Sequence, residues 1–323
     1  MGRRRNGSLA RRRSSPGRVR RRYESGLNLE NSLNPLLASF YALASSVLFA
    51  VFSVMARRNM RHASAFTGSL ITLSIGTVVL VVISAFLSSW RELTLPVALW
   101  FLVGGALAPG LAQALMFLSI GYIGVGRAMP LITVTPFFST LVAMVWLGER
   151  PGVVVLAATS LVVAGCVLIA LRREGEKPWR RIFILMPFAH AVSFAFAASI
   201  RKHVLALMPE PLLGATLSYA ISIPVLFVFY PFLPEDQRLS FNRAGVVGFA
   251  LAGSILTLSF FCHFTSYRYG DVSIIAPIVY TAPLFSLLLA RIWLKGEEEI
   301  TWQKTVGAVL LFIGMVVIIW QAA

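Results

Sequence analysis

Charged residues are scarce in this sequence. Only 13% of its 323 residues are Asp, Glu, Lys or Arg, whereas 57% are hydrophobic. Water-soluble domains carry about 25% charged residues and about 45–50% apolar residues. A water-soluble globular fold is therefore excluded, and the composition predicts a protein that lies in a lipid bilayer.

Acidic residues are absent from the middle of every long apolar run. The 13 Asp and Glu residues lie in the N-terminal segment, in short joins or at the ends of apolar runs. The sequence also has no paired carboxylates in those runs, no nucleophile motif and no phosphate-binding glycine loop. This pattern argues against an enzyme and against an ATP-driven pump, so we expect no catalytic residues and no cofactor.

Cysteine occurs only twice, at Cys166 and Cys262. Both residues lie in apolar runs, and no metal-ligand spacing surrounds either of them. We interpret both as packing residues and expect neither a disulfide nor a metal site.

Positive charge is concentrated at the N-terminus. Residues 1–34 hold 10 Arg and 2 Glu, with few apolar residues between them. Such a segment cannot bury enough apolar surface to fold alone, and its charge attracts anionic lipid headgroups. We predict that residues 1–34 form a disordered cytoplasmic tail that touches the membrane surface and binds no nucleic acid.

The rest of the chain consists of long apolar runs with short polar joins. About 20 apolar residues span the hydrocarbon core of a bilayer, and ten runs have about this length. Backbone amides in lipid must be paired within the protein, so these runs must be helices. The predicted spans are residues 35–56, 64–87, 96–120, 127–147, 152–171, 182–205, 212–233, 244–266, 272–294 and 302–320.

Two parts of the chain repeat each other. Residues 130–147 and 277–294 are identical at eight of 18 positions, at a constant offset of 147. Upstream, Arg57-Arg58 matches Arg201-Lys202, at the ends of the first and sixth spans. The repeat unit therefore contains five helices.

An odd number of helices per unit determines how the two units are oriented. The second unit, residues 182–321, must enter the membrane from the side opposite to the first, residues 35–173. The predicted fold is thus an all-α polytopic membrane protein, with ten transmembrane helices arranged as an inverted repeat of two five-helix bundles. This architecture is typical of secondary transporters, whose substrate site lies near the midplane between the halves.

Small residues recur at seven-residue spacing in the fifth and tenth spans. Stripes of this kind allow helices to pack closely. The contact forms either within the chain or across a homodimer, so the predicted oligomeric state is a monomer or a homodimer. The residues are Ala158, Gly165, Gly307 and Gly314.

Equivalent prolines interrupt one span in each repeat. A proline near the middle of a helix leaves the carbonyl four residues earlier without its helix partner, here at Ile132 and Val279. At membrane depth such carbonyls are tolerated only where protein or a water-filled cavity satisfies them. We interpret the prolines as cavity-lining or hinge residues, with packing kinks as the alternative. They are Pro130, Pro136, Pro277 and Pro283.

Few polar side chains lie within the spans. Gln113 either bonds another helix or contacts the solute, because an unpaired amide in lipid is costly. His190 and His263 either form interhelical hydrogen bonds or take up protons during transport. Tyr280 lies one turn before a proline, at the place that Thr133 has in the first repeat. The candidate solute-binding residues are therefore Gln113, Thr133, His190, His263 and Tyr280.

Together these residues resemble the drug/metabolite transporter superfamily, specifically its EamA-type members with ten helices. The resemblance depends on the duplicated five-helix unit, on Pro-x5-Pro-x-Phe-Ser in both repeats, and on the Trp-Leu-Gly-Glu-Arg turn at residues 146–150. The second repeat departs from this pattern at residues 295–299, where no Arg follows the acidic residue.

The resemblance implies a carrier of small metabolites in the inner (plasma) membrane, often an exporter, with helices surrounding a central cavity. It also implies that both termini are cytoplasmic. The distribution of Lys and Arg shows no bias, with 15 on the predicted inner side and 14 on the outer side. The ten-Arg tail nevertheless favours a cytoplasmic N-terminus, because its translocation is unfavourable.

The leading hypothesis is secondary transport of an amino-acid-like or other small organic solute by alternating access. The partners expected are this solute and the lipid bilayer. One alternative is a receptor or regulator that uses a transporter scaffold without transporting. A lipid-acting membrane enzyme is a further alternative, but it does not explain the inverted repeat.

Overall fold

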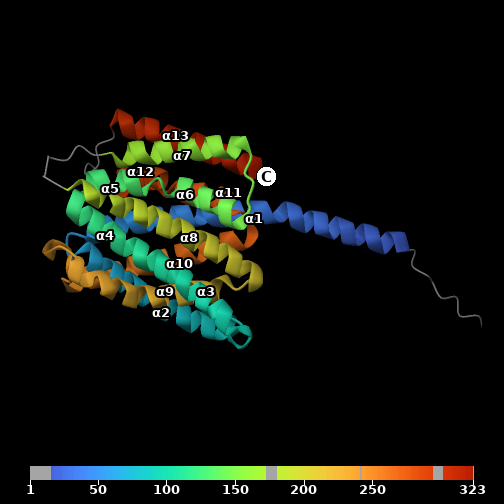
Figure 1. Ribbon diagram of the computed structural model, residues 1–323, viewed down its shortest axis with the longest axis horizontal. Helices are drawn as coiled ribbons and strands as arrows, with labels where there is room; N and C mark the ends of the chain where they lie inside the picture. Colours follow the sequence, from blue (N-terminus) through green and yellow to red (C-terminus); the bar gives the residue numbers. More distant parts are fainter. Residues whose placement is uncertain (1–15, 172–179, 241, 294–300, 323) are drawn as a thin grey trace, which may run out of the picture.

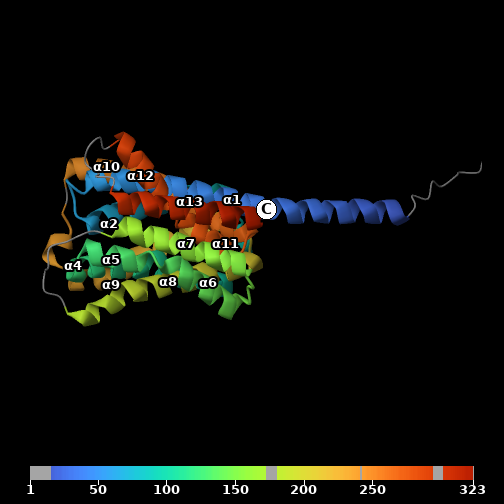
Figure 2. The same ribbon diagram turned by 90° about the horizontal axis from the view of Figure 1, so that it is seen from above.

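The computed structural model describes the chain except residues 1–15, 172–179, 241, 294–300 and 323, and it also leaves out the side chains of residues 16–34, 125, 126 and 236. Helices lie side by side in one bundle (Figures 1 and 2), and no strand occurs among the described residues. Ten helical segments in this part of the chain are long and apolar enough to cross a membrane. They coincide with the ten predicted runs, and their boundaries differ by at most three residues.

Seven helices and two π-helical segments form the first half of the bundle. They are α1 (Pro16–Asn59), α2 (Ala65–Leu87), α3 (Leu95–Gly105), η2 (Ala106–Leu111), α4 (Ala112–Ile123), α5 (Val125–Ile132), α6 (Thr135–Val142), η3 (Ala143–Leu147) and α7 (Val153–Ala170).

Six helices form the second half. They are α8 (Leu185–Leu207), α9 (Pro211–Phe229), α10 (Arg243–Tyr269), α11 (Val272–Val279), α12 (Ala282–Trp293) and α13 (Trp302–Ala322). Four short 3-10 turns lie between helices. They are η1 (Trp90–Glu92) between α2 and α3, η4 (Arg181–Ile184) before α8, and η5 (Tyr230–Phe232) and η6 (Glu235–Gln237) between α9 and α10.

Local sequence explains where several spans begin and end. The hydroxyl of Ser64 accepts a 3.1 Å hydrogen bond from the backbone N–H of Thr67 and so caps the first turn of α2. Gly124 and Gly148 have φ angles of 80° and 71°, in the region that favours glycine, and they end α4 and η3. The third, fourth and ninth spans each consist of two helices that meet at an interruption.

The contact between α7 and α13 shows that the two repeats run in opposite directions. A Cβ on Gly165 would lie 2.6 Å from the carbonyl oxygen of Gly307, and a Cβ on Gly314 would lie 2.8 Å from that of Ala158. Residue numbers rise along one helix as they fall along the other, so the helices are antiparallel. The small residues therefore pack against each other within the chain, which was one of the two predicted alternatives.

Two further interfaces obey the same two-fold relation. A Cβ on Gly68 of α2 would lie 2.5 Å from the Phe249 ring of α10, and a Cβ on Gly214 of α9 would lie 2.5 Å from the Phe101 ring of α3. α2 and α9 are the second spans of their repeats, and α3 and α10 belong to the third spans. Each contact therefore joins the second span of one repeat to the third span of the other, so the two contacts are equivalent. The described helices thus form an inverted repeat of two five-span bundles.

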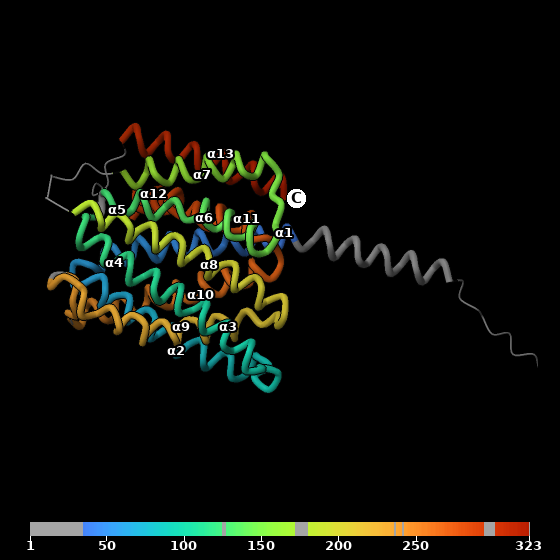
Figure 3. The backbone as a smooth tube through the Cα atoms, in the orientation of Figure 1, coloured from blue at the N-terminus to red at the C-terminus, as the bar shows by residue number. Residues whose placement is uncertain are grey.

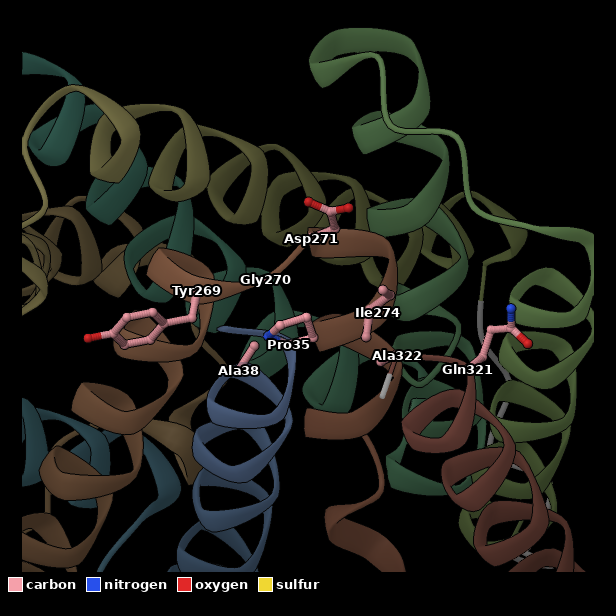
Figure 4. Close-up of a pocket in the computed structure, with 8 residues that line it drawn as sticks. All are labelled: Pro35, Ala38, Tyr269, Gly270, Asp271, Ile274, Gln321 and Ala322. Atoms are coloured by element: carbon pink, nitrogen blue, oxygen red, sulfur yellow. The ribbon is translucent and has the colours of Figure 1, made fainter. Parts of the chain in front are cut away.

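Both ends of the membrane bundle lie on the same face. Pro35 and Ala38 at the start of the first span, and Gln321 and Ala322 at the end of the last, line one cavity of about 370 Å³ (Figure 4). Of the predicted tail, residues 1–15 lie outside the described residues. For residues 16–34 only the backbone is described, as the first part of α1. Disorder of the tail stays a prediction.

Candidate solute-binding site

The third span is broken near its middle, inside η2. Ala108 has non-helical φ and ψ angles of −150° and 131°, between α3 and α4. The interruption frees carbonyls that would otherwise accept helix hydrogen bonds. Side chains of the second repeat donate to this segment: Ser222 Oγ to Gly105 (3.1 Å), Ser193 Oγ to Leu107 (2.8 Å), Arg201 Nη2 to Ala108, and His190 Nδ1 to Ala112 (2.6 Å).

Spans four and nine are broken at equivalent residues. The backbone N–H of Thr133 donates to the carbonyl of Met129 (3.0 Å), and that of Tyr280 donates to the carbonyl of Ala276 (3.1 Å), with each residue 147 positions later in the chain. Beyond the break, Phe137 N–H donates to Val134 (3.0 Å), and Leu284 N–H donates to Thr281 (2.9 Å). The sequence repeat is therefore reproduced by equivalent hydrogen bonds.

Hydroxyl side chains satisfy carbonyls at these two breaks. Thr135 Oγ1 donates to the carbonyl of Ile132 (2.6 Å), and Thr133 Oγ1 donates to that of Pro130 (2.8 Å). In the second repeat, Thr281 Oγ1 donates to Ile278 (2.6 Å). The carbonyl of Ile132, expected to lose its helix partner, thus bonds a side chain of the protein rather than requiring a water-filled cavity.

Each mid-span proline begins a new helix instead of bending one. Pro136 is the second residue of α6, and Pro283 is the second residue of α12. A proline costs nothing at this position, because its missing N–H would have no helix partner there. Pro130 and Pro277 lie inside α5 and α11, before the breaks. The first half-helix of span nine, α11, packs against α6.

Aromatic contacts bring three of the five candidate residues together around Phe194 of α8. The His190 ring stacks on Phe194 with ring centroids 6.2 Å apart, and the His263 ring of α10 stacks at the same centroid distance. Tyr280 meets Phe194 edge-on at 5.9 Å. His263 Nε2 also shares a 2.9 Å hydrogen bond with the hydroxyl of Tyr267. We call His190, Phe194, His263, Tyr267 and Tyr280 the central cluster.

The other two candidates bond elsewhere. Gln113 Nε2 donates to Ser69 Oγ of α2 at 2.6 Å, which is the interhelical bond that was one of its two alternatives. Thr133 is buried and donates within its own span. Solute contact by any of the five residues stays a prediction.

Arg201 lies next to the central cluster, although the sequence pattern predicts it at a helix end. It lies six residues, or about 9 Å along the axis, before the last residue of α8 at Leu207. Its side chain is 1% exposed. The guanidinium carbon lies 5.5, 5.0 and 5.1 Å from the ring centroids of Phe194, Phe260 and Phe264.

The guanidinium of Arg201 is charged and poorly compensated. Its Nε and Nη1 atoms have no hydrogen-bond partner among the described residues, and no described acidic side chain lies within ion-pair distance of it. Removing such a charge from water costs several kcal/mol, whereas a cation–π contact returns about 0.5–2 kcal/mol. Three rings and one carbonyl hold this cation without neutralising it.

Sequence reasoning missed Arg201 and the break in span three. Arg201 is followed by Lys202, and a basic pair near the end of an apolar run is the usual sign of a helix end. A signal for the break existed in the cluster Gly104-Gly105 and Pro109-Gly110, which places helix-disrupting residues in the middle of a span. Span eight is the counterpart of span three and contains no proline. Comparing the repeats therefore did not reveal the break in span three.

Three hydrogen bonds and one ion pair link neighbouring helices at the face that holds both ends. Glu149, after η3, accepts hydrogen bonds from the backbone N–H groups of Val272 (2.8 Å) and Ser273 (2.9 Å) at the start of α11. Lys202 Nζ donates to the carbonyl of Gly270 (2.8 Å) and lies 3.9 Å from an Asp271 carboxylate oxygen. The join between α10 and α11 is therefore held by the first repeat and by α8. We call these contacts the 270–273 clamp.

The cavity of Figure 4 lies beside the clamp rather than at the central cluster. It is lined by residues of α1, α13 and the α10–α11 join, including Gly270 and Asp271 (Figure 4). Figure 3 shows α8, which carries Arg201, running alongside α3, α4 and α6 of the first repeat, and the same helices are in contact. The buried site is thus built where the second repeat meets the first.

Comparison with known proteins supports this architecture. A solved structure titled "Crystal structure of protein" matches with a TM-score of 0.71 and 17% identity, over 87% of this chain and 95% of that chain. At this identity the likeness shows the fold alone. A search of curated proteins returns no match. The model of the EamA-like transporter family matches residues 36–171 and again residues 181–320, one match for each repeat. The chain therefore belongs to the EamA-like transporter family.

Proposed function

We propose that this protein is a secondary transporter that exports a small organic solute by alternating access. One observation carries the proposal: interrupted helices from both inverted halves converge on a buried cluster of polar and aromatic side chains. Broken helices at the interface of inverted repeats are how transporters place polar groups inside a membrane. A receptor built on the same scaffold has no need of interruptions in both repeats.

In the proposed mechanism the central cluster binds the solute. His190, His263 and Tyr280 supply ring nitrogens and a hydroxyl, and Phe194 supplies an apolar surface between them. Since a carbonyl only accepts, the bond to Ala112 requires that Nδ1 of His190 carries a proton. Gln113 bonds Ser69 and Thr133 bonds the Pro130 carbonyl, and in this mechanism both orient the surrounding helices.

Opening of the site requires the 270–273 clamp to release. Glu149 holds the start of α11 with two charge-assisted hydrogen bonds, and this class of bond is about twice as strong as a neutral one. When the clamp releases, α11 moves relative to α6, and the breaks next to Pro136 and Pro283 absorb the motion. Pro130 and Pro277 bound the half-helices that move.

The membrane setting follows from the same proposal. We place the protein in the plasma membrane as a multi-pass monomer or homodimer, with both termini cytoplasmic and with the Arg-rich residues 1–34 against anionic lipid. The two functional units are residues 35–173 and 182–321. Labelling of single cysteines in the 172–181 join from each side of intact cells tests the orientation, because cytoplasmic-only labelling would reverse it.

Counterflow in proteoliposomes tests the transport function. Purified protein is reconstituted, the vesicles are loaded with unlabelled amino acids and small organic acids in turn, and uptake of the labelled solute is measured. A carrier accelerates exchange when solute is present on both sides, whereas a channel does not. We expect accelerated uptake for at least one solute, with protein-free vesicles as the control. Absence of counterflow for every solute, together with solute binding in detergent, would support the receptor alternative instead.

A further inference from the structure

We infer that Arg201 is the anchor for a carboxylate, so that the solute is a small organic acid with an apolar body. The inference rests on the transport function proposed above and specifies the chemistry of its substrate. It starts from a cation that is 1% exposed and has two unpartnered nitrogens, Nε and Nη1, among the described residues.

The guanidinium of Arg201 retains a complete two-donor edge. Nη2 carries two hydrogens, of which the Ala108 carbonyl takes one. The other hydrogen lies on an edge that Nη2 shares with either Nε or Nη1, and both of those atoms are unpartnered. A planar guanidinium edge matches the two oxygens of a carboxylate in a bidentate pair.

The surroundings of Arg201 supply no competing anion. No described acidic side chain pairs with Arg201, and Asp271, which is largely exposed, lies 3.9 Å from Lys202 instead. Around the guanidinium itself lie the rings of Phe194, Phe260 and Phe264, which attract a cation without neutralising it. A carboxylate ligand would therefore pair with the guanidinium, and the apolar part of the ligand would contact the three phenylalanine rings.

The repeat offers an internal argument against a purely structural role. Arg57 is the sequence counterpart of Arg201 at the end of the first span, and it is exposed. A buried arginine is thus no requirement of the five-helix scaffold. A neutral donor would satisfy the Ala108 carbonyl equally well, as Ser193 and Ser222 do for the neighbouring carbonyls of Leu107 and Gly105.

The ligand is a dissolved acid rather than a lipid. Arg201 is enclosed by α8, α10 and the broken third span, and its side chain does not reach the outer surface of the bundle. A lipid headgroup at this place would have to pull its acyl chains between packed helices. Inorganic phosphate shares the charge but lacks an apolar body, so it serves as the probe that separates general anion binding from recognition of an organic acid.

Thermal shift in detergent tests the inference without requiring transport. The full-length protein is heated with acetate, benzoate, phenylacetate or 3-phenylpropionate, each beside its carboxamide, and with inorganic phosphate. We expect at least one aromatic acid to raise the Tm in a concentration-dependent way, and its carboxamide and phosphate to have less than a tenth of its apparent affinity. R201Q should raise the half-saturating concentration at least tenfold, whereas R57Q, the matched control, should not change it.

A second variant keeps the inference falsifiable if R201Q does not fold. R201K retains the charge but not the two-donor edge, so it should also bind the acid at least tenfold more weakly. Equal binding of acid and amide, unchanged binding by R201Q or R201K, or no binding of any of the four acids would overturn the inference. Stronger binding of phosphate than of every acid would overturn the organic-acid assignment.

The same reagents separate this inference from the proposed function. Acid binding that depends on Arg201 without counterflow would contradict transport and leave the carboxylate site standing. Counterflow of a neutral solute that R201Q leaves unchanged would uphold transport and overturn the site.

Discussion

Arg57 and Arg201 hold equivalent places in the two repeats, yet the first is exposed and the second is fully buried. The immediate cause is helix length. The first span ends two residues after Arg57, at Asn59, whereas α8 continues for six residues after Arg201. The opposing third span adds a broken backbone whose Ala108 carbonyl accepts from the buried guanidinium.

The proposed solute site thus departs from the two-fold symmetry that the helix packing and the breaks of spans four and nine follow. The contacts that hold the halves together come in two-fold related pairs, such as Gly68 with Phe249 and Gly214 with Phe101. The charged site does not come in a pair. Under the proposed mechanism, symmetric packing supports two alternating states, whereas the solute needs only one binding site.

Adding a methyl group to a symmetric contact should have the largest effect. A Cβ on Gly105 would lie 2.3 Å from Ser218 Cα, and one on its counterpart Gly253 would lie 2.9 Å from Thr72 Cα. Backbone atoms cannot yield as a flexible side chain does, so G105A and G253A should each lower the free energy of unfolding by about 1–3 kcal/mol, with G105A at the upper end.

Chemical denaturation in detergent measures this effect, and G152A serves as the control. Nothing lies within 4 Å of a Cβ on Gly152. Wild-type stability in G105A would show that the third span does not pack against α9 as described.

Replacing the buried arginine should stabilise the protein, unlike replacing its exposed counterpart. R201M removes an uncompensated buried charge and keeps an apolar side chain, at the cost of leaving the Ala108 carbonyl without that donor. We expect a net gain of about 1 kcal/mol in the free energy of unfolding, seen as a higher Tm, together with loss of acid binding.

R57M, unlike R201M, should not raise the Tm. That variant should leave the Tm within the error of the measurement, because surface substitutions usually change stability by less than about 0.5 kcal/mol. If R57M and R201M shifted the Tm equally, the distinction between a structural and a binding arginine would fail.

Weakening the 270–273 clamp should have a local effect rather than a global one. E149Q keeps one acceptor oxygen, which is now neutral, and places an amide NH2 group that cannot accept against the second backbone N–H. We expect the backbone amides of Val272 and Ser273 to exchange with deuterium about tenfold faster, which corresponds to about 1.4 kcal/mol. Mass spectrometry of the exchanged peptides measures this, with E92Q in the exposed η1 turn as the control, and equal exchange in both variants would exclude a clamp at Glu149.

The bond between Gln113 and Ser69 should contribute least. Hydrogen bonds between transmembrane helices couple by about 0.6 kcal/mol on average. A double-mutant cycle of Q113L and S69A on the free energy of unfolding should give a coupling of that size and leave acid binding unchanged. Loss of acid binding in Q113L alone would move Gln113 from the packing role to the solute site.

Much of the fold could be predicted from the sequence because a bilayer permits few solutions. Runs of about 20 apolar residues must be helices, and an odd repeat unit must invert. The duplicated prolines likewise marked the interruptions of spans four and nine, although each proline starts a helix rather than bending one.

The candidate site could be predicted only in part. His190, His263 and Tyr280 stood out as polar residues in apolar runs, and they meet around Phe194. The burial of Arg201 could not be predicted, because it depends on how far α8 extends and on which helices enclose it. The acceptor of Arg201 is a backbone carbonyl freed by a break in another helix, and one-dimensional spacing does not show such a partner.

In the proposed mechanism, Arg201 and its neighbours form one site that opens to each face of the membrane in turn. Thiol labelling of F194C, in a background with Cys166 and Cys262 replaced by serine, tests it most directly, because Phe194 lies against the guanidinium. In right-side-out and inside-out vesicles, we predict labelling by an impermeant reagent from either face, with protection by the acid that binds. Labelling from one face only, or labelling that the acid leaves unchanged, would contradict the account.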